Sequence, residues 1–292
     1  MKPVAFDYYR PAKVLDAVAL LSQLGPEAAV LAGGMTLGPM LNLRMVRPAA
    51  LVDISRIEEL KSIRVNSHSV ITGTGVTQAD AQRSEMIFGN VPLLTLALPW
   101  VGHFQTRNRG TLGGSVAHAD PSAEIPLCLV VCGGTVVLQS RRRERRVAAR
   151  DFFQGPLTTE RRPDEMVTAL EWPRAASDAG HAFSEIAQRH GDFAIAAAAC
   201  QLCLDNGGRV QALSLGLGGV ENRPFAIETA GVLGMPADEV AARLSQQVAV
   251  GVTPMEDHSA RAEFRLALAQ VLVERVVREA IQDAKRRKST LG

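Results

Sequence analysis

Along the first 55 positions of the chain, apolar residues occur either at the spacing of one helix face or in short continuous runs. Val14, Val18 and Leu21 are spaced as on one face of an amphipathic helix, and Gly25 follows where such a helix would end. Short apolar runs bounded by turn residues predict buried strands. The predicted elements are a helix ending at Gly25, a strand at 28–31, a loop at 32–36, a helix at 37–44 and a strand at 51–54. This order suits a small parallel sheet.

From about residue 63 the pattern changes to pairs of strand-like runs joined by short polar turns. Such pairs predict β-hairpins. The predicted elements are hairpins at 63–74 and 135–148, helices at 77–88 and 92–98, and strands at 182–188, 194–204 and 210–217. A turn at 206–208, Asn-Gly-Gly, joins the last two strands. The mostly basic segment at 141–146, which begins in the arginine-rich turn at 140–143, is interpreted as a solvated hairpin tip, with a docking patch for an acidic partner protein as the alternative.

The C-terminal segment predicts a helix. Phe264, Leu268, Val271 and Leu272 form an apolar stripe, and the basic residues at 285–288 oppose the negative end of the helix dipole. Upstream, the periodic pattern lapses at 172–178, which predicts a linker. The pattern by itself therefore predicts a larger α/β domain up to about Pro173 and a smaller α+β domain after it.

Composition agrees with a folded chain of about two domains. The 292 residues are 47% hydrophobic and 21% charged. The formal net charge of +2 is too even to favour nucleic acid or an anionic membrane as the main partner. No stretch reaches the ~18 consecutive apolar residues of a membrane span, and the N-terminus has no signal-peptide pattern. We therefore expect a cytoplasmic protein with no membrane span and no nucleic-acid partner.

The four cysteines include one Cys-x-x-Cys pair, Cys200 and Cys203. Such a pair can bind zinc or carry out redox chemistry. Here it lies in an apolar, alanine-rich run, and positions three apart in a strand point to opposite faces, which is poor for chelation. The pair is therefore interpreted as structural. The sequence predicts no metal ligands and no catalytic nucleophile.

Two glycine pairs carry the main chemical signal. The first, Gly33 and Gly34, lies between a predicted strand and a predicted helix, where main-chain N–H groups and the helix dipole favour an anion such as phosphate. A simple tight turn is the alternative for this pair taken alone. The second, Gly113 and Gly114, is framed by the hydroxyl residues Thr111 and Ser115, which can donate to phosphate or ribose oxygens.

Two carboxylates, Asp120 and Glu124, follow the second glycine pair. Carboxylates suit sugar hydroxyls, as in other dinucleotide sites. The alternative is that they form an N-cap and a solvated helix start. His103 and His118 lie near the same loop and are interpreted as structural or surface histidines rather than proton-transfer groups.

Together these motifs resemble the FAD-binding medium subunits of molybdenum hydroxylases, the carbon monoxide dehydrogenase and xanthine dehydrogenase relatives. The resemblance rests on Ala-Gly-Gly-x-Thr-Leu at 32–37, Arg-Asn-x-Gly-Thr-Leu-Gly-Gly-Ser at 107–115 and Ala-Asp-Pro-x-Ala-Glu-x-Pro at 119–126, and it covers nearly the whole chain. It implies an α+β fold. A vanillyl-alcohol-oxidase (PCMH)-type FAD-binding domain over 1–175 would precede a smaller C-terminal α+β domain over 176–292, with a three-stranded antiparallel sheet and helices.

The resemblance also implies the cofactor site, in which both glycine loops wrap the FAD phosphates and ribityl chain. The implied FAD-binding residues are Val30, Leu31, Ala32, Gly33, Gly34, Met35, Thr36, Leu37, Val101, Thr111, Leu112, Gly113, Gly114, Ser115, Asp120, Glu124 and Val167. Phe193 stands where the family often has an aromatic near the flavin. Residues 184–186 read Ser-Glu-Ile where the family often has a lysine close to the flavin, and Met35 replaces a common histidine or glutamine.

The function implied by the resemblance is electron transfer in a heterotrimer. A large partner subunit would carry the molybdenum cofactor, and a small partner would carry two [2Fe–2S] clusters. FAD in this chain would receive the electrons and pass them to an external acceptor. Two alternatives stay open, namely a self-sufficient FAD-dependent oxidoreductase on the same fold and a non-enzymatic phosphate- or nucleotide-binding module.

Overall fold

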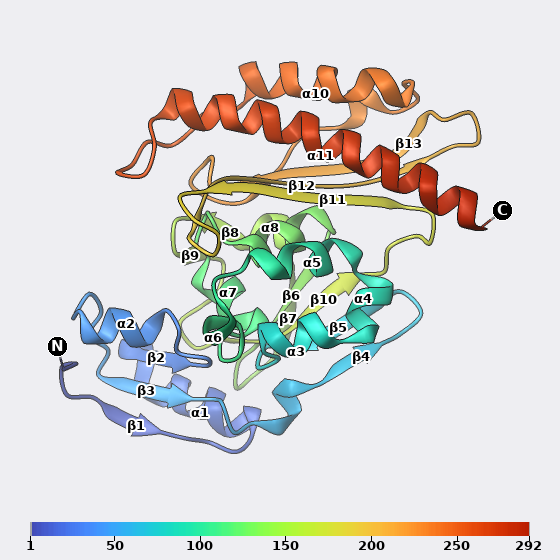
Figure 1. The fold of residues 1–292 in the computed structure, drawn as a ribbon. Helices are drawn as coiled ribbons and strands as arrows, with labels where there is room; N and C mark the ends of the chain where they lie inside the picture. Colours follow the sequence, from blue (N-terminus) through green and yellow to red (C-terminus); the bar gives the residue numbers. More distant parts are fainter. Residues whose placement is uncertain (1, 292) are drawn as a thin grey trace.

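The N-terminal part of the chain folds around a small parallel sheet, as predicted. In this computed structural model, which describes residues 2–291, the sheet has the strand order β1-β3-β2 (Figure 1). α1 packs on it through Ala17, Val18 and Leu21 and ends at Gly25, whose φ is 72°. α2 ends two residues earlier than predicted because Arg44 adopts a positive φ of 58°. The elements are β1 (Asp7–Tyr9), α1 (Val14–Leu24), β2 (Ala28–Leu31), α2 (Leu37–Asn42) and β3 (Ala50–Asp53).

The middle part is built on an antiparallel sheet of strand order β4-β5-β10-β6-β7. Both predicted hairpins are confirmed. The predicted helix at 77–88 is two helices, because Ser84 leaves the helical conformation and its hydroxyl accepts from the N–H of Ile87. The elements are β4 (Ile63–Val65), β5 (Ser69–Gly73), α3 (Gln78–Arg83), α4 (Glu85–Asn90), α5 (Pro92–Ala97), α6 (Phe104–Arg107), α7 (Leu112–His118), α8 (Glu124–Val131), β6 (Thr135–Gln139), β7 (Glu144–Ala148), α9 (Ala149–Phe152), β8 (Phe153–Gly155), β9 (Thr158–Thr159) and β10 (Met166–Pro173).

The central strand of this sheet, β10, is the main element that the sequence pattern did not predict. The linker predicted to begin at Trp172 was wrong at its start, because Trp172 and Pro173 belong to β10. Trp172 is fully buried, and its indole N–H donates to the Thr72 hydroxyl over 3.1 Å. A bulge at Thr168 interrupts the alternation of buried and exposed residues in β10, so that only Leu170 to Pro173 alternate, and this run is too short to predict the strand.

The C-terminal part forms a second antiparallel sheet of order β11-β12-β13-β14, one strand more than expected. Figure 1 shows α10 and α11 covering one face, while α5 and α8 lie on the other. β12 is therefore buried on both faces: Ala196 and Ala198 face the helices, and Ala197 and Ala199 face the middle part. The elements are β11 (Gly180–Ala187), β12 (Ala194–Leu204), β13 (Val210–Gly218), β14 (Phe225–Ala226), α10 (Ala237–Gly251) and α11 (Ala262–Leu291).

The predicted C-terminal helix is confirmed as α11, but its buried stripe differs from the predicted one. Phe264 and Val271 are more than half exposed, whereas Leu272, Val273 and Val276 are fully buried. The true stripe is displaced around the helix because the partner surface is the sheet together with α10. No helix in the described chain combines the length and the apolar character that a bilayer crossing requires.

Candidate cofactor site between two glycine loops

The two glycine loops, far apart in the sequence, are in direct main-chain contact. A Cβ built on Gly33 would lie 2.0 Å from the carbonyl oxygen of Arg109 and 2.9 Å from Cα of Gly110. A Cβ on Gly114 would lie 3.9 Å from Cβ of Ala32. Only glycine at position 33 therefore lets the first loop (32–36) seat against the second (107–115).

The first loop presents a run of free main-chain donors. Gly34 adopts a φ of 72°, and the first helical hydrogen bonds of α2 run from Gly38 N to Gly34 O and from Met40 N to Thr36 O. Within residues 2–291, the N–H groups of residues 33–37 have no hydrogen-bond acceptor, and the Thr36 side chain does not cap the helix. Consecutive free N–H groups at the end of a parallel strand form an anion-binding site.

The second loop uses its main-chain donors inside the protein. Leu112 N donates to Val76 O, Gly113 N to Thr74 O, and Gly114 N to the Thr111 hydroxyl oxygen at 2.9 Å. What the second loop can offer a ligand is therefore its hydroxyl groups, since the Thr111 O–H proton and Ser115 remain available. Thus the first loop supplies main-chain donors and the second supplies side-chain donors.

Glycine is favoured at positions 113 and 114 of the second loop for two different structural reasons. A Cβ on Gly113 would lie 1.7 Å from Thr74 Oγ1 and 2.6 Å from Thr74 Cα, so Gly113 lets α7 pack against the chain that follows β5. A Cβ on Gly114 would meet the Thr111 hydroxyl at 2.8 Å and Cβ of Ala32 at 3.9 Å, with nothing else within 4 Å. Gly113 therefore serves the fold, whereas Gly114 borders the open side of the loop contact.

The two predicted carboxylates have different surroundings. Asp120 stabilises its own turn by accepting from Ser122 N over 2.8 Å. Glu124 is the first residue of α8 and is only 7% exposed, so it is not part of a solvated helix start. Burial, with a smaller contribution from the charge of Asp120, raises the pKa of Glu124 to about 7. Near neutral pH Glu124 therefore exists as both a carboxylic acid and a carboxylate.

The remaining predicted residues lie on elements that adjoin the loop contact. Val101, Leu112 and Val167 belong to one hydrophobic cluster. Val167 precedes a bulge in β10 at Thr168, whose carbonyl accepts from Thr74 N, and Thr74 in turn contacts Gly113. Val30 and Leu31 end β2 and, with Met35 and Leu37, are partly exposed at the first loop.

The cysteines and histidines that the sequence singled out lie in different environments. No group of three or more His, Cys, Asp or Glu side chains in residues 2–291 is arranged to hold a metal ion. Cys200 is buried toward the helices and Cys203 is partly exposed, so the Cys-x-x-Cys pair is divided between environments. His103 is exposed, and burial lowers the pKa of His118.

Two buried polar side chains next to the site were not assigned a role from the sequence. Gln78 is 5% exposed, its Oε1 has no partner among residues 2–291, and its amide lies about 3 Å from where a Cβ on Gly110 would be. Glu185 is 4% exposed, and neither carboxyl oxygen has a partner in the same range. The departure from the family pattern at 184–186 was the only sequence signal for Glu185, and Gln78 had none.

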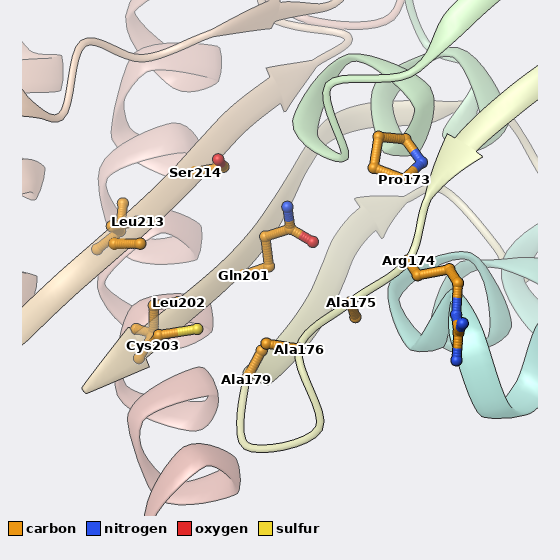
Figure 2. Close-up of a pocket in the computed structure, with 11 residues that line it drawn as sticks. Pro173, Arg174, Ala175, Ala176, Ala179, Gln201, Leu202, Cys203, Leu213 and Ser214 are labelled. Carbon is orange, nitrogen blue, oxygen red and sulfur yellow. The ribbon is translucent and has the colours of Figure 1, made fainter. Parts of the chain in front are cut away.

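A small open cavity lies elsewhere, between the 174–179 segment and strands β12 and β13. Figure 2 shows Gln201 and Cys203 on one side and Arg174 on the other. Its volume of about 120 Å³ is well below the ~300–1,000 Å³ of typical small-molecule sites, and it is therefore too small for a dinucleotide. The predicted FAD-binding residues do not line it.

Two models of known protein families together match most of the chain. A model described as the FAD binding domain in molybdopterin dehydrogenase matches residues 4–175. A second, described as the CO dehydrogenase flavoprotein C-terminal domain, matches residues 181–280. The first match contains both glycine loops. The second contains nearly all of β11, strands β12 to β14, α10 and most of α11.

Individual relatives match over their full lengths. The 6-hydroxypseudooxynicotine dehydrogenase complex subunit alpha of Paenarthrobacter nicotinovorans is 33% identical over 294 residues, covering 100% of this chain and 99% of that protein. The carbon monoxide dehydrogenase medium chain of Afipia carboxidovorans is 35% identical over 288 residues, covering 98% and 100%. A solved carbon monoxide dehydrogenase chain from Hydrogenophaga pseudoflava superposes with a TM-score of 0.94 at 32% identity, covering 97% of this chain and 99% of that one.

Proposed function

The chain belongs to the FAD-binding medium subunits of the carbon monoxide dehydrogenase and xanthine dehydrogenase family, and on that premise we propose that it binds one FAD between its two glycine loops and relays electrons within a three-subunit oxidoreductase. FAD would receive electrons from the [2Fe–2S] clusters of a small partner subunit and pass them to an external acceptor. A large partner subunit would carry the molybdenum cofactor.

One observation carries the assignment of the site, namely the contact between Gly33 and the Arg109–Gly110 main chain beside the free N–H groups of residues 33–37. A diphosphate needs several donors converging on a surface that carries no Cβ atoms. The first loop has both properties, and the open side of Gly114 borders it. The residues present therefore fit a diphosphate-containing cofactor.

We assign the roles within the site as follows. The N–H groups of residues 33–37 donate to diphosphate oxygens, and the hydroxyls of Thr111 and Ser115 add side-chain donors. Asp120 and Glu124 accept from ribityl or ribose hydroxyls. Bound FAD supplies the redox chemistry, so the chain contributes binding, orientation and electrostatics and needs no nucleophile of its own.

The proposed domain boundary lies between residues 175 and 176. The segment between β10 and β11 is short, and the two family matches end and begin on either side of it, at 175 and 181. The FAD-binding domain would be 1–175 and the C-terminal domain 176–292. We place the assembled protein in the cytoplasm.

Co-purification tests this assignment. A tagged form of this chain is purified from its native cells, together with any untagged partner subunits that bind it. The account predicts a complex with one FAD, one molybdenum and four iron atoms per copy of this chain, since two [2Fe–2S] clusters hold four irons. Substrate turnover by the isolated, FAD-loaded chain would instead favour a self-sufficient oxidoreductase. Failure of the chain to retain flavin in either form would reject the proposed function.

A further inference from the structure

Gln78 is a buried amide whose carbonyl oxygen has no hydrogen-bond donor. It is the first residue of α3 and is 5% exposed, and its Oε1 has no partner among residues 2–291. A methionine side chain has the same length and would fill this position without leaving a buried acceptor unsatisfied, which costs free energy. Stability therefore does not explain the amide, and its role must lie in what it contacts.

The Gln78 amide lies flat against Gly110 of the second loop. A Cβ on Gly110 would lie 2.8 Å from Oε1 and 3.0 Å from both Cδ and Nε2 of Gln78. Because the three atoms of this planar group are almost equally far from one point, the plane faces that point broadside. A flat amide is thinner than a chain of CH₂, sulfur and CH₃ groups, so it can lie close to a main chain that carries no Cβ.

The main chain at the start of α3 is tied to the same part of the second loop. Gln78 N donates to Gly110 O over 2.8 Å, and Thr77 pairs with Thr111 in a β-bridge. Thr77 also caps α3, since its hydroxyl oxygen accepts from Asp80 N over 3.0 Å. The first turn of α3 is therefore a fixed support for residues 110 and 111.

Gly110 in turn contacts the first loop. A Cβ on Gly33 would lie 2.9 Å from Cα of Gly110, so the Gly110 main chain touches both Gly33 and the Gln78 amide. A shift of Gly110 would change the separation between the free N–H groups of residues 33–37 and the Thr111 hydroxyl. A ligand that bonds to both loops needs that separation to be fixed, because hydrogen bonds weaken steeply when their geometry is lost.

We propose that Gln78 is a positioning residue of the cofactor site, whose amide supports Gly110 and thereby sets the spacing of the two glycine loops around the FAD diphosphate. This inference rests on the proposed function, because the spacing matters to a cofactor that bridges both loops. Gln78 acts through Gly110 and does not touch FAD, since its Oε1 is buried. A buried amide kept at a cost in stability is what a functional site allows.

The first test measures FAD affinity and stability separately in the wild-type chain and in Gln78→Met. Affinity is measured by flavin fluorescence titration, and stability by urea unfolding of the FAD-free chain. Methionine removes the unpaired acceptor, but it is thicker than the amide and displaces Gly110. We expect FAD to bind at least tenfold more weakly, while the urea midpoint stays equal or rises.

Gln82 provides the matched control, because it lies on the same helix and is exposed. Gln82→Met makes the same chemical change away from the second loop. It should match the wild-type chain in FAD affinity.

A double-variant cycle tests the contact itself. Gly110→Ala places a Cβ against the amide, and Gln78→Ala removes the amide, so each should weaken FAD binding about tenfold. In the double variant the new methyl group occupies part of the space that the amide has left. It should therefore bind FAD at least as well as either single variant, and not a hundredfold more weakly, as independent effects would give.

The outcomes separate the inference from the proposed function. If the wild-type chain binds no FAD, the proposed function fails and the inference fails with it. If the wild-type chain binds FAD and Gln78→Met binds it equally well, only the inference fails. A Gln78→Met chain that loses stability together with affinity, or does not fold, would show that Gln78 serves the fold alone. Multiplicative losses in the double variant would also overturn the inference.

Discussion

Gly33 packs directly on the main chain of Arg109, so that a Cβ at position 33 would lie 2.0 Å from the Arg109 carbonyl oxygen. This contact joins the small parallel sheet to the loop that begins α7. It brings the free donors of the first loop next to the hydroxyls of the second. The cofactor site therefore depends on how two subdomains meet, not on either loop alone.

Replacement of Gly33 by alanine tests the importance of this contact for cofactor binding. The added Cβ clashes with main-chain atoms that cannot move independently, so the loops must separate. We expect FAD affinity to fall at least a hundredfold, with a loss of about 1–3 kcal/mol in the free energy of unfolding. Flavin titration and thermal unfolding measure the two effects.

Gly38 provides the matched control, because a Cβ there meets nothing within 4 Å. Gly38→Ala should bind FAD as the wild-type chain does and be equally or slightly more stable. Equal losses of affinity in both variants would show that the clash at Gly33 does not explain the effect.

Substitution of the two glycines of the second loop should have different effects, one mainly on FAD binding and the other on folding. Gly114→Val projects into the open side of the loop contact, where its Cβ comes close to the Thr111 hydroxyl and within 4 Å of Ala32. We expect a largely folded chain that has lost FAD retention, with a stability loss of about 1 kcal/mol from the disturbed cap. Gly113→Val runs into Thr74 and should fail to fold, as seen by circular dichroism. Stoichiometric FAD in purified Gly114→Val would contradict the placement of the site.

The Glu124 carboxyl should contribute to FAD affinity without being essential. Glu124→Ala removes one polar contact but leaves the donors of both loops in place. We expect an increase in Kd of about tenfold, corresponding to one hydrogen bond. An unchanged Kd, measured by fluorescence titration at pH 7, would show that Glu124 does not contact the cofactor.

Stability of the FAD-free chain should fall as pH rises through neutrality. Burial raises the pKa values of Glu124 and Glu185 to about 7 and about 8, so the folded state keeps protons that the unfolded state has already released. Unfolding then becomes easier with rising pH until each folded-state pKa is passed. His181, whose pKa burial lowers to about 4, has the opposite effect only below about pH 6.5.

The measurement is urea unfolding from pH 6.5 to 8.5. The wild-type chain should lose about 1–2 kcal/mol more than Glu185→Gln over this range, since one pKa unit corresponds to about 1.4 kcal/mol. Parallel curves for the two proteins would mean that Glu185 titrates near its ordinary pKa in the folded state.

Local patterns predicted much of the fold because they report local geometry. The strand at 28–31, the turn at 206–208 and the helix that Gly25 ends all follow from residues within a few positions of one another. The sequence pattern did not predict β10, because the conformation of this strand depends on its partners at 69–73 and 135–139 rather than on its own pattern. The apolar stripe of α11 was displaced for the same reason.

The site was predictable only in part. The glycine pairs identified both loops, but nothing near Gly33 indicates that its partner is Arg109, since that contact joins separate subdomains. Glu185 illustrates the same limit. Its sequence position on a strand is ordinary, and its lack of a partner becomes apparent only when β11 faces α8 across the domain boundary.

The most direct test of the account is a crystal structure of the FAD-loaded chain. We predict one FAD per chain, with its diphosphate hydrogen-bonded to the main-chain N–H groups of residues 33–37 and adjoining Thr111 and Gly114. Electron density for FAD at any other place, with the two glycine loops unoccupied, would contradict the central claim.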